Sequence, residues 1–350
     1  MLARASTFTL DGLDARAVTV EVDVRRGLPS FGIIGLADTA IREARERVRT
    51  AIINSGLAFP ALRVTASLAP ADLRKAGPGL DLPLACALLA ASDQLPPERL
   101  DGWVLFGELG LDGSLRGARG TLAIADAAAR SAAGQLLLAQ AGAEEAALVP
   151  GIGVHAAASL RDALAVLRGE PRARSRARAR AMKPRGADAT CTPATPAHDL
   201  SDVRGQHDAV RALVVAAAGG HNLLLSGAPG TGKTMIARRA PSILPPLDAA
   251  EAVEVARIES SLGREVRSLP SERPFRAPHH TITPAGMMGA GPRGWAGEAV
   301  RAHHGVLFLD SHSLCSLGSR HGPRRLLPRL PGQGPRGRLV PVARPPAPAD

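Results

Sequence analysis

Short apolar segments with two different periods divide the first half of the chain. From Val18 to Val24, valine alternates with polar or small residues, which is the period of a half-buried strand. The other segments predicted as strands are 33–34, 63–68, 103–109, 135–139 and 153–157. The segments with helical spacing are 38–56, 82–91, 122–132 and 160–167. Because strands and helices alternate, residues 1–169 are predicted to form one α/β domain.

Residues 199–310 repeat this alternation. Leu223–Leu225 and Gly305–Asp310 are short apolar runs predicted as buried strands. Helices are predicted over 206–218 and 248–262, and the residues expected on the inward face of the second are Ala250, Val253, Ala256 and Ile258. A second α/β domain is therefore predicted here.

Between the two domains, residues 170–198 break both periods. Pro171–Ala181 alternates arginine with alanine or serine, and Pro193 and Pro196 follow. Such a segment has few large apolar residues to bury, so we predict a solvated linker. A basic arm that contacts nucleic-acid phosphates is the alternative.

A glycine-rich loop follows the run Leu223–Leu225 and has the G-x-x-x-x-G-K-[ST] spacing of a phosphate-binding loop. Gly230 and Gly232 permit backbone angles at which successive N–H groups turn toward a phosphate. Lys233 is expected to contact the β- and γ-phosphates, and Thr234 to offer its hydroxyl to Mg²⁺. The predicted binding residues are Gly227, Ala228, Pro229, Gly230, Thr231, Gly232, Lys233 and Thr234.

Two other interpretations of this loop are weaker. A dinucleotide-binding G-x-G-x-x-G would need a third glycine where Met235 stands. A purely structural strand–helix turn would not require a lysine, yet Lys233 is one of only three lysines in an arginine-rich chain. A nucleoside triphosphate with Mg²⁺ is therefore the preferred ligand.

The predicted strand Gly305–Asp310 ends in an acid. In nucleotide-hydrolysing folds, an acid at this position beside the phosphate loop holds the Mg²⁺ ion. Asp310 is therefore predicted as the metal anchor that complements Thr234, and Lys233 and Asp310 as the catalytic pair. A strand that ends in aspartate is by itself mostly structural, and the phosphate loop upstream favours the metal role.

Composition and charge narrow the function classes. Of the 350 residues, 45% are hydrophobic and 2% are aromatic, as in a globular protein with few rings for base stacking. Residues 171–186 and 311–350 hold thirteen arginines, one lysine and one acid, and so account for the net charge of +11. The domains are not basic themselves, and charge alone does not predict nucleic-acid binding.

The apolar runs and the cysteines bear on location. No apolar run approaches the roughly 18 residues of a membrane span, and the N-terminus lacks the order of a signal peptide. Cys86, Cys191 and Cys315 lie far apart without a C-x-x-C pair, which favours a reducing compartment and no zinc cluster. We expect a cytoplasmic protein with no membrane partner.

Seven segments carry a family signature that includes the motifs LAPADLRKAGPGLDLPLA, GAPGTGKTMIARR and HHGVLFLD. The segments are Val20–Ile52, Leu68–Ala85, Phe106–Gly117, Asp199–Leu213, Gly227–Arg239, Arg273–Thr281 and His303–Asp310. Together they resemble the YifB/ComM group of magnesium-chelatase-like AAA+ ATPases. The resemblance implies an N-terminal domain similar to the C-terminal domain of Lon protease (ribosomal S5-like) and a P-loop AAA+ αβα module that binds ATP.

The resemblance also implies how such proteins work. Members of the group are similar to hexameric ATP-driven motors, so a homo-oligomer is expected. The ComM branch acts on branched DNA during natural transformation, so DNA is the implied partner. Both expectations come from the family and not from the composition or spacing of this chain.

The Lon-like domain is predicted to be proteolytically silent. A Lon-type peptidase uses a Ser–Lys pair within hydrogen-bond reach. In the loop Lys75–Leu80, Gly79 stands at the position of the serine, and the next lysine is Lys183 in the linker.

Two adjacent histidine pairs, His279–His280 and His303–His304, match family motifs. Neighbours on a strand point to opposite faces and rarely share a metal, and zinc sites usually have spaced ligands. We therefore predict loop or packing roles for these histidines, and the sequence assigns no further role to them.

The resemblance ends after Asp310. In the family, a glutamate that polarises the attacking water follows LFLD, but Ser311 stands there, and serine is no base at neutral pH. The sensor residue, arginine finger and helical lid of an AAA+ module are not recognisable in residues 311–350, an Arg/Pro-rich stretch expected to be disordered. We therefore expect an incomplete AAA+ module over 199–310 and a truncated or out-of-frame end.

Three functions are compatible with these features. The first is an ATP-driven motor that remodels DNA. The second is a non-hydrolysing nucleotide-binding protein or an inactive fragment, favoured by Ser311 and by a last strand that would leave an exposed sheet edge. The third and weakest is a magnesium chelatase-type subunit. The sequence leaves open whether ATP is hydrolysed.

Overall fold

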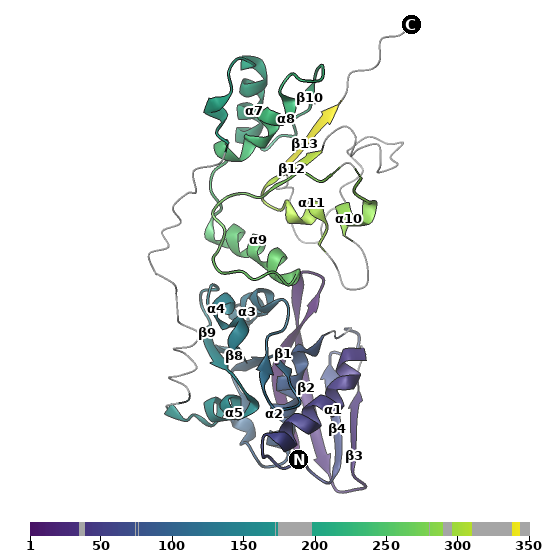
Figure 1. Cartoon of the computed structure of the whole chain (residues 1–350). Coiled ribbons are helices and arrows are strands. Elements are labelled where there is room, and N and C mark those ends of the chain that lie inside the picture. The colour runs from purple at the N-terminus through teal and green to yellow at the C-terminus, as the bar shows by residue number, and fades with distance from the viewer. Residues whose placement is uncertain are drawn as a thin grey trace. The chain divides into compact units, whose positions relative to one another are not determined.

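The computed structural model describes residues 1–34, 39–73, 75, 77–171, 173, 198–279, 281–289, 296–309 and 338–343. Its contacts divide the chain into two compact units (Figure 1). Unit 1 comprises residues 1–187 and 259–268, and unit 2 comprises residues 188–258 and 269–350. Both units combine helices with a sheet, so the predicted α/β class is confirmed.

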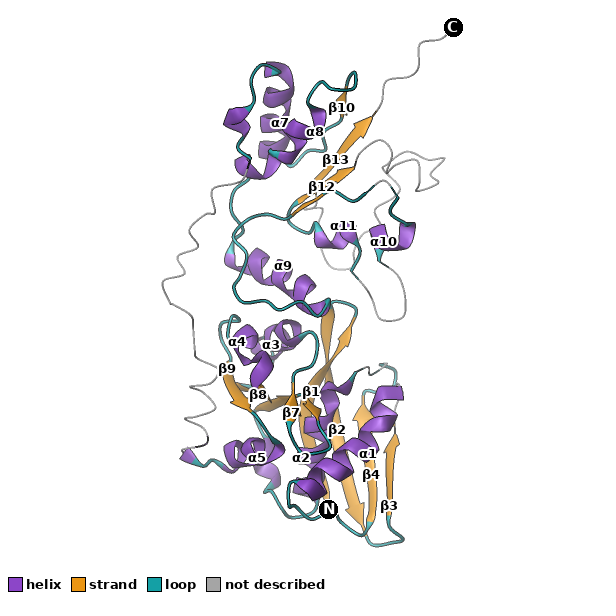
Figure 2. Cartoon of the chain, in the orientation of Figure 1, coloured by secondary structure: helices purple, strands orange, loops and turns teal. Residues whose placement is uncertain are grey.

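A seven-stranded mixed sheet forms the centre of unit 1, with the order β3-β4-β2-β1-β5-β8-β9 (Figure 2). β1 and β2 form a long antiparallel hairpin, and β4 adds antiparallel to β2. The remaining neighbours, from β3 to β4 and from β1 through β5 and β8 to β9, are parallel. The strands are β1 Leu2–Asp11, β2 Asp14–Arg25, β3 Ser30–Ile34, β4 Arg63–Ala69, β5 Trp103–Phe106, β8 Gln135–Ala139 and β9 Gly153–Ala157.

Among the described residues of unit 1, the helices with printed bounds are α1 Thr39–Asn54, α2 Asp81–Ala91, α3 Thr121–Ala129, α4 Gln140–Ala146 and α5 Leu160–Arg168. All eleven residues of α2 are buried, including Cys86, so this helix is apolar on every side. Its one charged residue, Asp81, accepts two hydrogen bonds from Arg47 on α1, at 2.9 and 3.1 Å. Burial nevertheless raises the pKa of Asp81 to about 6, against the opposing effect of Arg47.

Unit 2 contains a four-stranded parallel sheet with the order β10-β13-β12-β11. Its strands are β10 Leu225–Ser226, β11 Phe275–Arg276, β12 Val306–Leu309 and β13 Arg338–Ala343. Its helices are α7 His207–Gly219, α8 Lys233–Arg238, α10 Pro284–Met288 and α11 Glu298–Arg301, together with α9 Ala249–Ser261, whose last residues are counted with unit 1.

Strand β13 corrects one expectation. Residues 311–350 were expected to be disordered, with the strand before Asp310 left as an exposed edge. Residues 338–343 instead pair with both β10 and β12, and β11 covers the other side of β12. The segment RLVPVA is a short apolar run among arginine and proline, which the composition of the stretch concealed. Residues 310–337 and 344–350 lie outside the described part.

Small side chains account for the elements that the pattern missed. β1 buries Ala3, Ala5, Thr7 and Thr9 on one face, and Phe8 is the large apolar residue that it buries besides these small ones, so no hydrophobic period marks the strand. On α9 the predicted inward face is confirmed in part: Ala256 and Ile258 are buried, whereas Ala250 is exposed and Ala252 and Val255 are buried in addition. The predicted hairpin turn at Leu111–Leu115 is confirmed, since β6 Glu108–Leu109 and β7 Leu115–Arg116 pair antiparallel.

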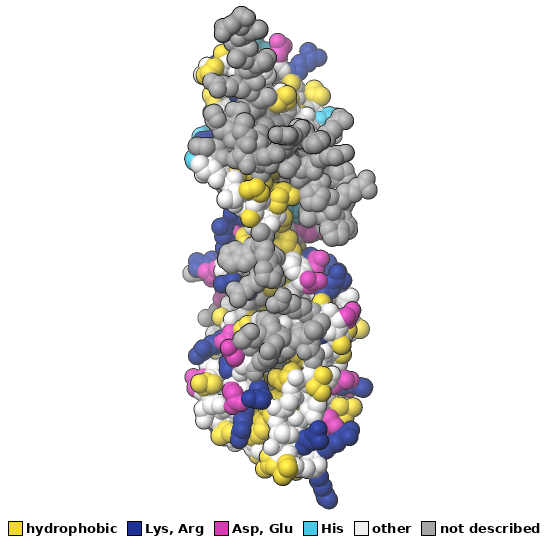
Figure 3. All heavy atoms as spheres, turned by 90° about the vertical axis from the view of Figure 1, so that its right-hand side faces the viewer, with side chains coloured by type: hydrophobic (Ala, Val, Ile, Leu, Met, Phe, Trp, Pro, Cys, Tyr) yellow, Lys and Arg dark blue, Asp and Glu magenta, His cyan; other side chains and the backbone are white. Residues whose placement is uncertain are grey.

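The charges on the surface of unit 1 do not point to one class of ligand. On the face of unit 1 seen in Figure 3, basic and acidic side chains are interspersed. Among the described residues, no helix combines the length and apolar character needed to cross a membrane. Asp38, Lys183 and nearly all of the predicted linker (172 and 174–197) lie outside the described residues.

Candidate nucleotide-binding site

The loop Gly227–Thr234 connects β10 to α8 in unit 2. Gly230 and Gly232 both have φ of +82°, a left-handed value, and Gly232 is the residue that precedes the helix. Pairs of helical and left-handed residues create concave backbones whose N–H groups bind anions. Ala228, Pro229 and Thr231 are exposed, so the loop is open to a ligand.

Lys233 folds back over this loop. Its Nζ donates hydrogen bonds to the carbonyl oxygens of Gly227 at 3.0 Å and Ala228 at 2.7 Å, and lies 3.4 Å from the Thr231 hydroxyl. Gln206, which precedes α7, also contacts the loop, because its side-chain amide donates a hydrogen bond to the carbonyl oxygen of Thr231. A cation held above a glycine-rich backbone is a donor set that fits a polyphosphate, so the residues present fit the expected nucleotide.

Apolar packing holds both ends of the loop. Ile236 and Ala237 on α8 are buried, and they join Leu225 of β10 and Phe308 of β12 in one cluster. Phe308 also stacks on Phe275 of β11, with ring centroids 6.1 Å apart. Because strand and helix share a core, the loop between them has a fixed entry and exit, as a preorganised binding loop requires.

Of the two predicted metal-binding residues, only Thr234 lies among the described residues. Thr234 lies half-buried in the first turn of α8. Asp310 and Ser311 lie outside the described residues, which end at Leu309 at the end of β12. β13 lies between β10 and β12, so two strand spacings separate the strand before the loop from the strand that leads to Asp310.

A cluster of histidine and glutamate side chains lies immediately before β12. Nε2 of His303 and Nε2 of His304 lie 2.9 and 2.6 Å from the same oxygen, Oε2 of Glu254 on α9. Both histidines belong to a turn, in which His304 has a φ of +55°. The predicted loop position is therefore confirmed for this pair, but the rule that neighbours point to opposite faces, which holds on a strand, does not apply to it. A turn of this kind leaves no signal in the sequence.

Ionisation in this cluster follows from its contacts. Burial opposes the charge of Glu254, but hydrogen bonds from His304 and His303 outweigh it and lower the pKa of Glu254 to about 2. Burial is also the main cause of a lowered pKa at His303. The cluster therefore holds an ionised carboxylate at neutral pH.

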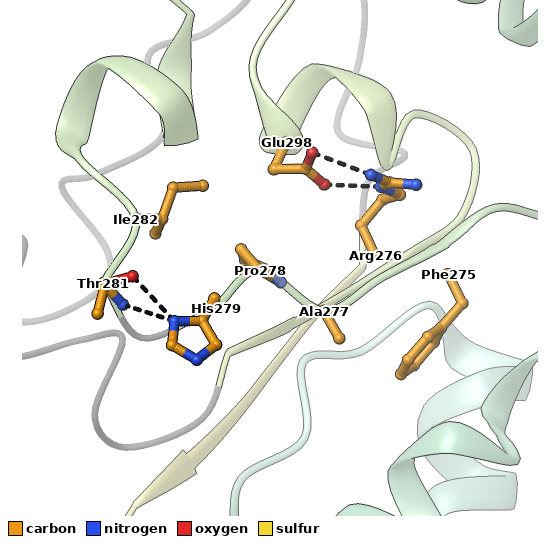
Figure 4. A pocket seen from close by; sticks show the side chains of 8 residues that line it. All are labelled: Phe275, Arg276, Ala277, Pro278, His279, Thr281, Ile282 and Glu298. Carbon is orange, nitrogen blue, oxygen red and sulfur yellow. Dashed lines mark hydrogen bonds and ion pairs between the residues drawn. The ribbon is translucent and has the colours of Figure 1, made fainter.

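His279, of the other histidine pair, borders a cavity of about 470 Å³ beside β11 (Figure 4). Arg276 and Glu298 form a two-point ion pair at 2.7 and 2.9 Å on one side of it. His279 lies on the opposite side, with Nδ1 2.9 Å from the hydroxyl of Thr281. His280 lies outside the described residues.

In unit 1, the neighbourhood of Gly79 bears on the peptidase question. A Cβ built at Gly79 would lie 2.7 Å from Cζ of the Phe106 ring. A serine there would require Phe106 to move, because carbon atoms do not approach so closely. Lys75 is fully buried, and its ammonium donates to the carbonyl of Pro70.

Two family models match the chain. The model described as "Magnesium chelatase, subunit ChlI" matches residues 199–316, and the one described as "Subunit ChlI of Mg-chelatase" matches residues 20–142. The second match lies within unit 1, and the first covers the phosphate loop and the strand that leads to Asp310.

Curated relatives match most of the chain. YifB of Escherichia coli is 45% identical over 300 residues, which is 85% of this chain and 57% of that protein. YifB of Salmonella typhimurium is 45% identical over 310 residues, or 88% and 59%. "Competence protein ComM" of Haemophilus influenzae is 41% identical over 303 residues, or 85% and 58%. The chain spans less than two thirds of the length of these relatives. On these matches, it belongs to the YifB/ComM family of magnesium-chelatase-like proteins.

Proposed function

We propose that this chain binds ATP with Mg²⁺ through the loop Gly227–Thr234. The observation that carries the proposal is the Lys233 ammonium, which is hydrogen-bonded to the loop's own carbonyls beside two left-handed glycines. A cation held over an open backbone of this kind is the arrangement that phosphate loops use. Membership of a magnesium-chelatase-like family supports the same proposal.

Each residue has a defined task in this proposal. The N–H groups of the loop and Nζ of Lys233 bind phosphate oxygens, and Thr234 with Asp310 holds Mg²⁺. The ion, when bound, neutralises charge on the β- and γ-phosphates. Lys233 exchanges its carbonyl partners for phosphate oxygens, and the new hydrogen bonds are stronger because both partners are charged.

The test is a titration of the full chain with MgATP by calorimetry. We expect Lys233→Ala to weaken binding at least ~10-fold, which corresponds to about 1.4 kcal/mol. Arg238→Ala is the matched control, because Arg238 is an exposed cation at the other end of α8. Equal affinities of Lys233→Ala and the unaltered chain would refute the loop as the site.

We further propose that the chain binds ATP but hydrolyses it slowly, because Ser311 cannot serve as the base that activates the attacking water. Ser311→Glu should raise the steady-state rate of ATP hydrolysis and leave the affinity for MgATP unchanged. Rapid hydrolysis by the unaltered chain, abolished by Lys233→Ala, would show that position 311 does not limit turnover.

For the whole protein we propose a cytoplasmic homo-oligomer, a hexamer as in the family, that remodels DNA. The support is family membership and the name of the competence relative. We expect gel-shift binding of four-way or forked DNA to exceed that of linear duplex and to fall steeply as salt rises. Equal retention of linear and branched DNA at every salt concentration would contradict the remodelling role.

We also propose that unit 1 has no peptidase activity, since Gly79 has no nucleophile and lies against Phe106. The purified chain should leave a casein-type substrate intact. Cleavage that survives removal of contaminating proteases would refute this.

A further inference from the structure

Three ligand atoms converge at the start of β12. Nε2 of His303, Nε2 of His304 and Oε2 of Glu254 all lie within 4.8 Å of one another. Two imidazole nitrogens and a carboxylate oxygen are the donor set that Zn²⁺ accepts in sites that keep a fourth position open. Tetrahedral bonds of about 2.0–2.1 Å place ligand atoms ~3.3 Å apart. The hydrogen bonds of 2.9 and 2.6 Å in this cluster are shorter than that spacing by about 0.4 and 0.7 Å, so the side chains must move apart by less than 1 Å to admit the ion.

The surroundings of His304 have the arrangement that metal-bound histidines require. Its side chain is 6% exposed, and its Nδ1 makes no hydrogen bond among the described residues. That Nδ1 lies 3.4 Å from Oε1 of Glu251, one turn before Glu254 on α9. Metal-ligating histidines commonly donate the second ring N–H to a carboxylate, which fixes the tautomer and leaves the other nitrogen for the metal.

Arg273 fixes this second carboxylate in turn. Its Nη2 lies 2.8 Å from Oε2 of Glu251, and its Nη1 donates to the main-chain carbonyl of His304 at 2.9 Å. The positive φ of His304 is an uncommon angle for a residue with a side chain, and such angles persist where the surroundings enforce them. Side-chain and backbone contacts thus hold the ring of His304 toward Glu254.

We propose that Glu254, His303 and His304 bind a Zn²⁺ ion through Oε2 and the two Nε2 atoms, with Glu251 orienting His304. Binding requires each Nε2 to be free of a proton: a neutral imidazole then carries its proton on Nδ1, which for His304 faces Glu251, and an imidazolium releases one proton to water. A fourth position is left for water. The ion joins α9 to the start of β12, the strand that leads to Asp310. The site is separate from the nucleotide loop and does not depend on it.

The experiment is titration of the chelator-treated full chain with Zn²⁺, followed by calorimetry and metal analysis after gel filtration. One Zn²⁺ per chain is expected, with a rise in melting temperature on binding. Co²⁺ should give the intense visible absorption of a tetrahedral site. His303→Ala and Glu254→Gln should each remove high-affinity binding, and Glu251→Gln should weaken it 10–100-fold. His279→Ala, an exposed histidine outside the cluster, should bind as the unaltered chain does.

The Zn²⁺ affinities of the variants are compared only where each variant is folded. Glu254→Gln preserves side-chain volume, and circular dichroism before titration identifies any variant that has lost structure. Lys233→Ala should bind Zn²⁺ normally even where it loses ATP. The proposal is overturned if the folded, chelator-treated chain takes up no Zn²⁺, or if His303→Ala and Glu254→Gln bind it with unchanged affinity. The cluster would then be a histidine–carboxylate hydrogen-bond network only.

Discussion

Two reasons for a glycine can be distinguished at Gly230 of the phosphate loop: a lack of space for a Cβ, and a backbone φ that a residue with a Cβ disfavours. A Cβ built at this position meets no atom of the described residues within 4 Å, so an alanine would have space. The φ of +82° is nevertheless a left-handed value, which costs a residue with a Cβ about 1–2 kcal/mol. The glycine is therefore required by the backbone and not by crowding.

Gly230→Ala should lower the free energy of unfolding by about 1–2 kcal/mol in urea denaturation. Gly134→Ala is the control, because a Cβ there also meets no described atom within 4 Å and the φ of Gly134 is not left-handed. That variant should stay within about 0.5 kcal/mol of the unaltered chain. A Gly230→Ala variant as stable as Gly134→Ala would contradict the angle requirement.

Glu298 is one of the residues of unit 2 whose protonation in acid should lower the stability of the fold. Hydrogen bonds from Arg276 are the main cause of its lowered pKa. A carboxyl with a pKa below its ordinary 4.5 in the folded state stabilises the fold above pH 4.5. That stabilisation is lost as the pH falls below this value.

Urea unfolding at several pH values tests this ion pair. The gap in unfolding free energy between the unaltered chain and Glu298→Gln should be largest at neutral pH and narrow below pH 4.5. Glu272→Gln, which changes an exposed glutamate, should follow the unaltered chain throughout. A gap that stays constant or widens in acid would show that Glu298 is not held ionised by Arg276.

Residue types predicted the loop better than the histidine cluster. The spacing of Gly232 and Lys233 is a local motif, so the sequence carries it whole. The meeting of His303 and His304 depends on one positive φ and on Glu254, about 50 residues earlier. No periodicity encodes that combination, and the alternation rule for strands does not apply to a turn.

Elements were predictable where large apolar residues mark the buried face. β8 has the predicted bounds and α2 differs by one residue, because their leucine side chains fill the core; β9 also has the predicted bounds, although Val154 is its one large aliphatic residue. α4 was missed, since its buried residues are Gly142, Ala143 and Ala146, which contribute no hydrophobic period. Burial by small residues is decided by the sheet above them and not by the local pattern.

The complete burial of α2 has a measurable consequence. Leu88→Ala should destabilise the chain by about 2–5 kcal/mol, because the side chain is fully buried and leaves a cavity. Leu111→Ala removes the same atoms from a side chain that is 55% exposed, and should cost less than about 0.5 kcal/mol. Urea denaturation measures both, and equal losses would contradict the packing of α2.

At the scale of the whole molecule, the ranges that the family models match can be compared with the two larger sheets. The two family models match residues 20–142 and 199–316. Each range contains strands of one of the two larger sheets, together with the helices between them. β13 lies beyond both ranges, yet it pairs between β10 and β12. Strand order is a long-range property, so the sequence could predict the α/β class but not the strand inserted from the last 40 residues.

Amide hydrogen exchange of the full chain tests the central claim most directly, because it reports on the loop itself. We expect the peptide that spans Gly227–Thr234 to exchange more slowly with MgATP than with Mg²⁺ alone, since bound phosphates occupy its N–H groups. Lys233→Ala should show no such protection. Binding of ATP by calorimetry without slower exchange in this peptide would contradict the account, because the nucleotide would then lie elsewhere.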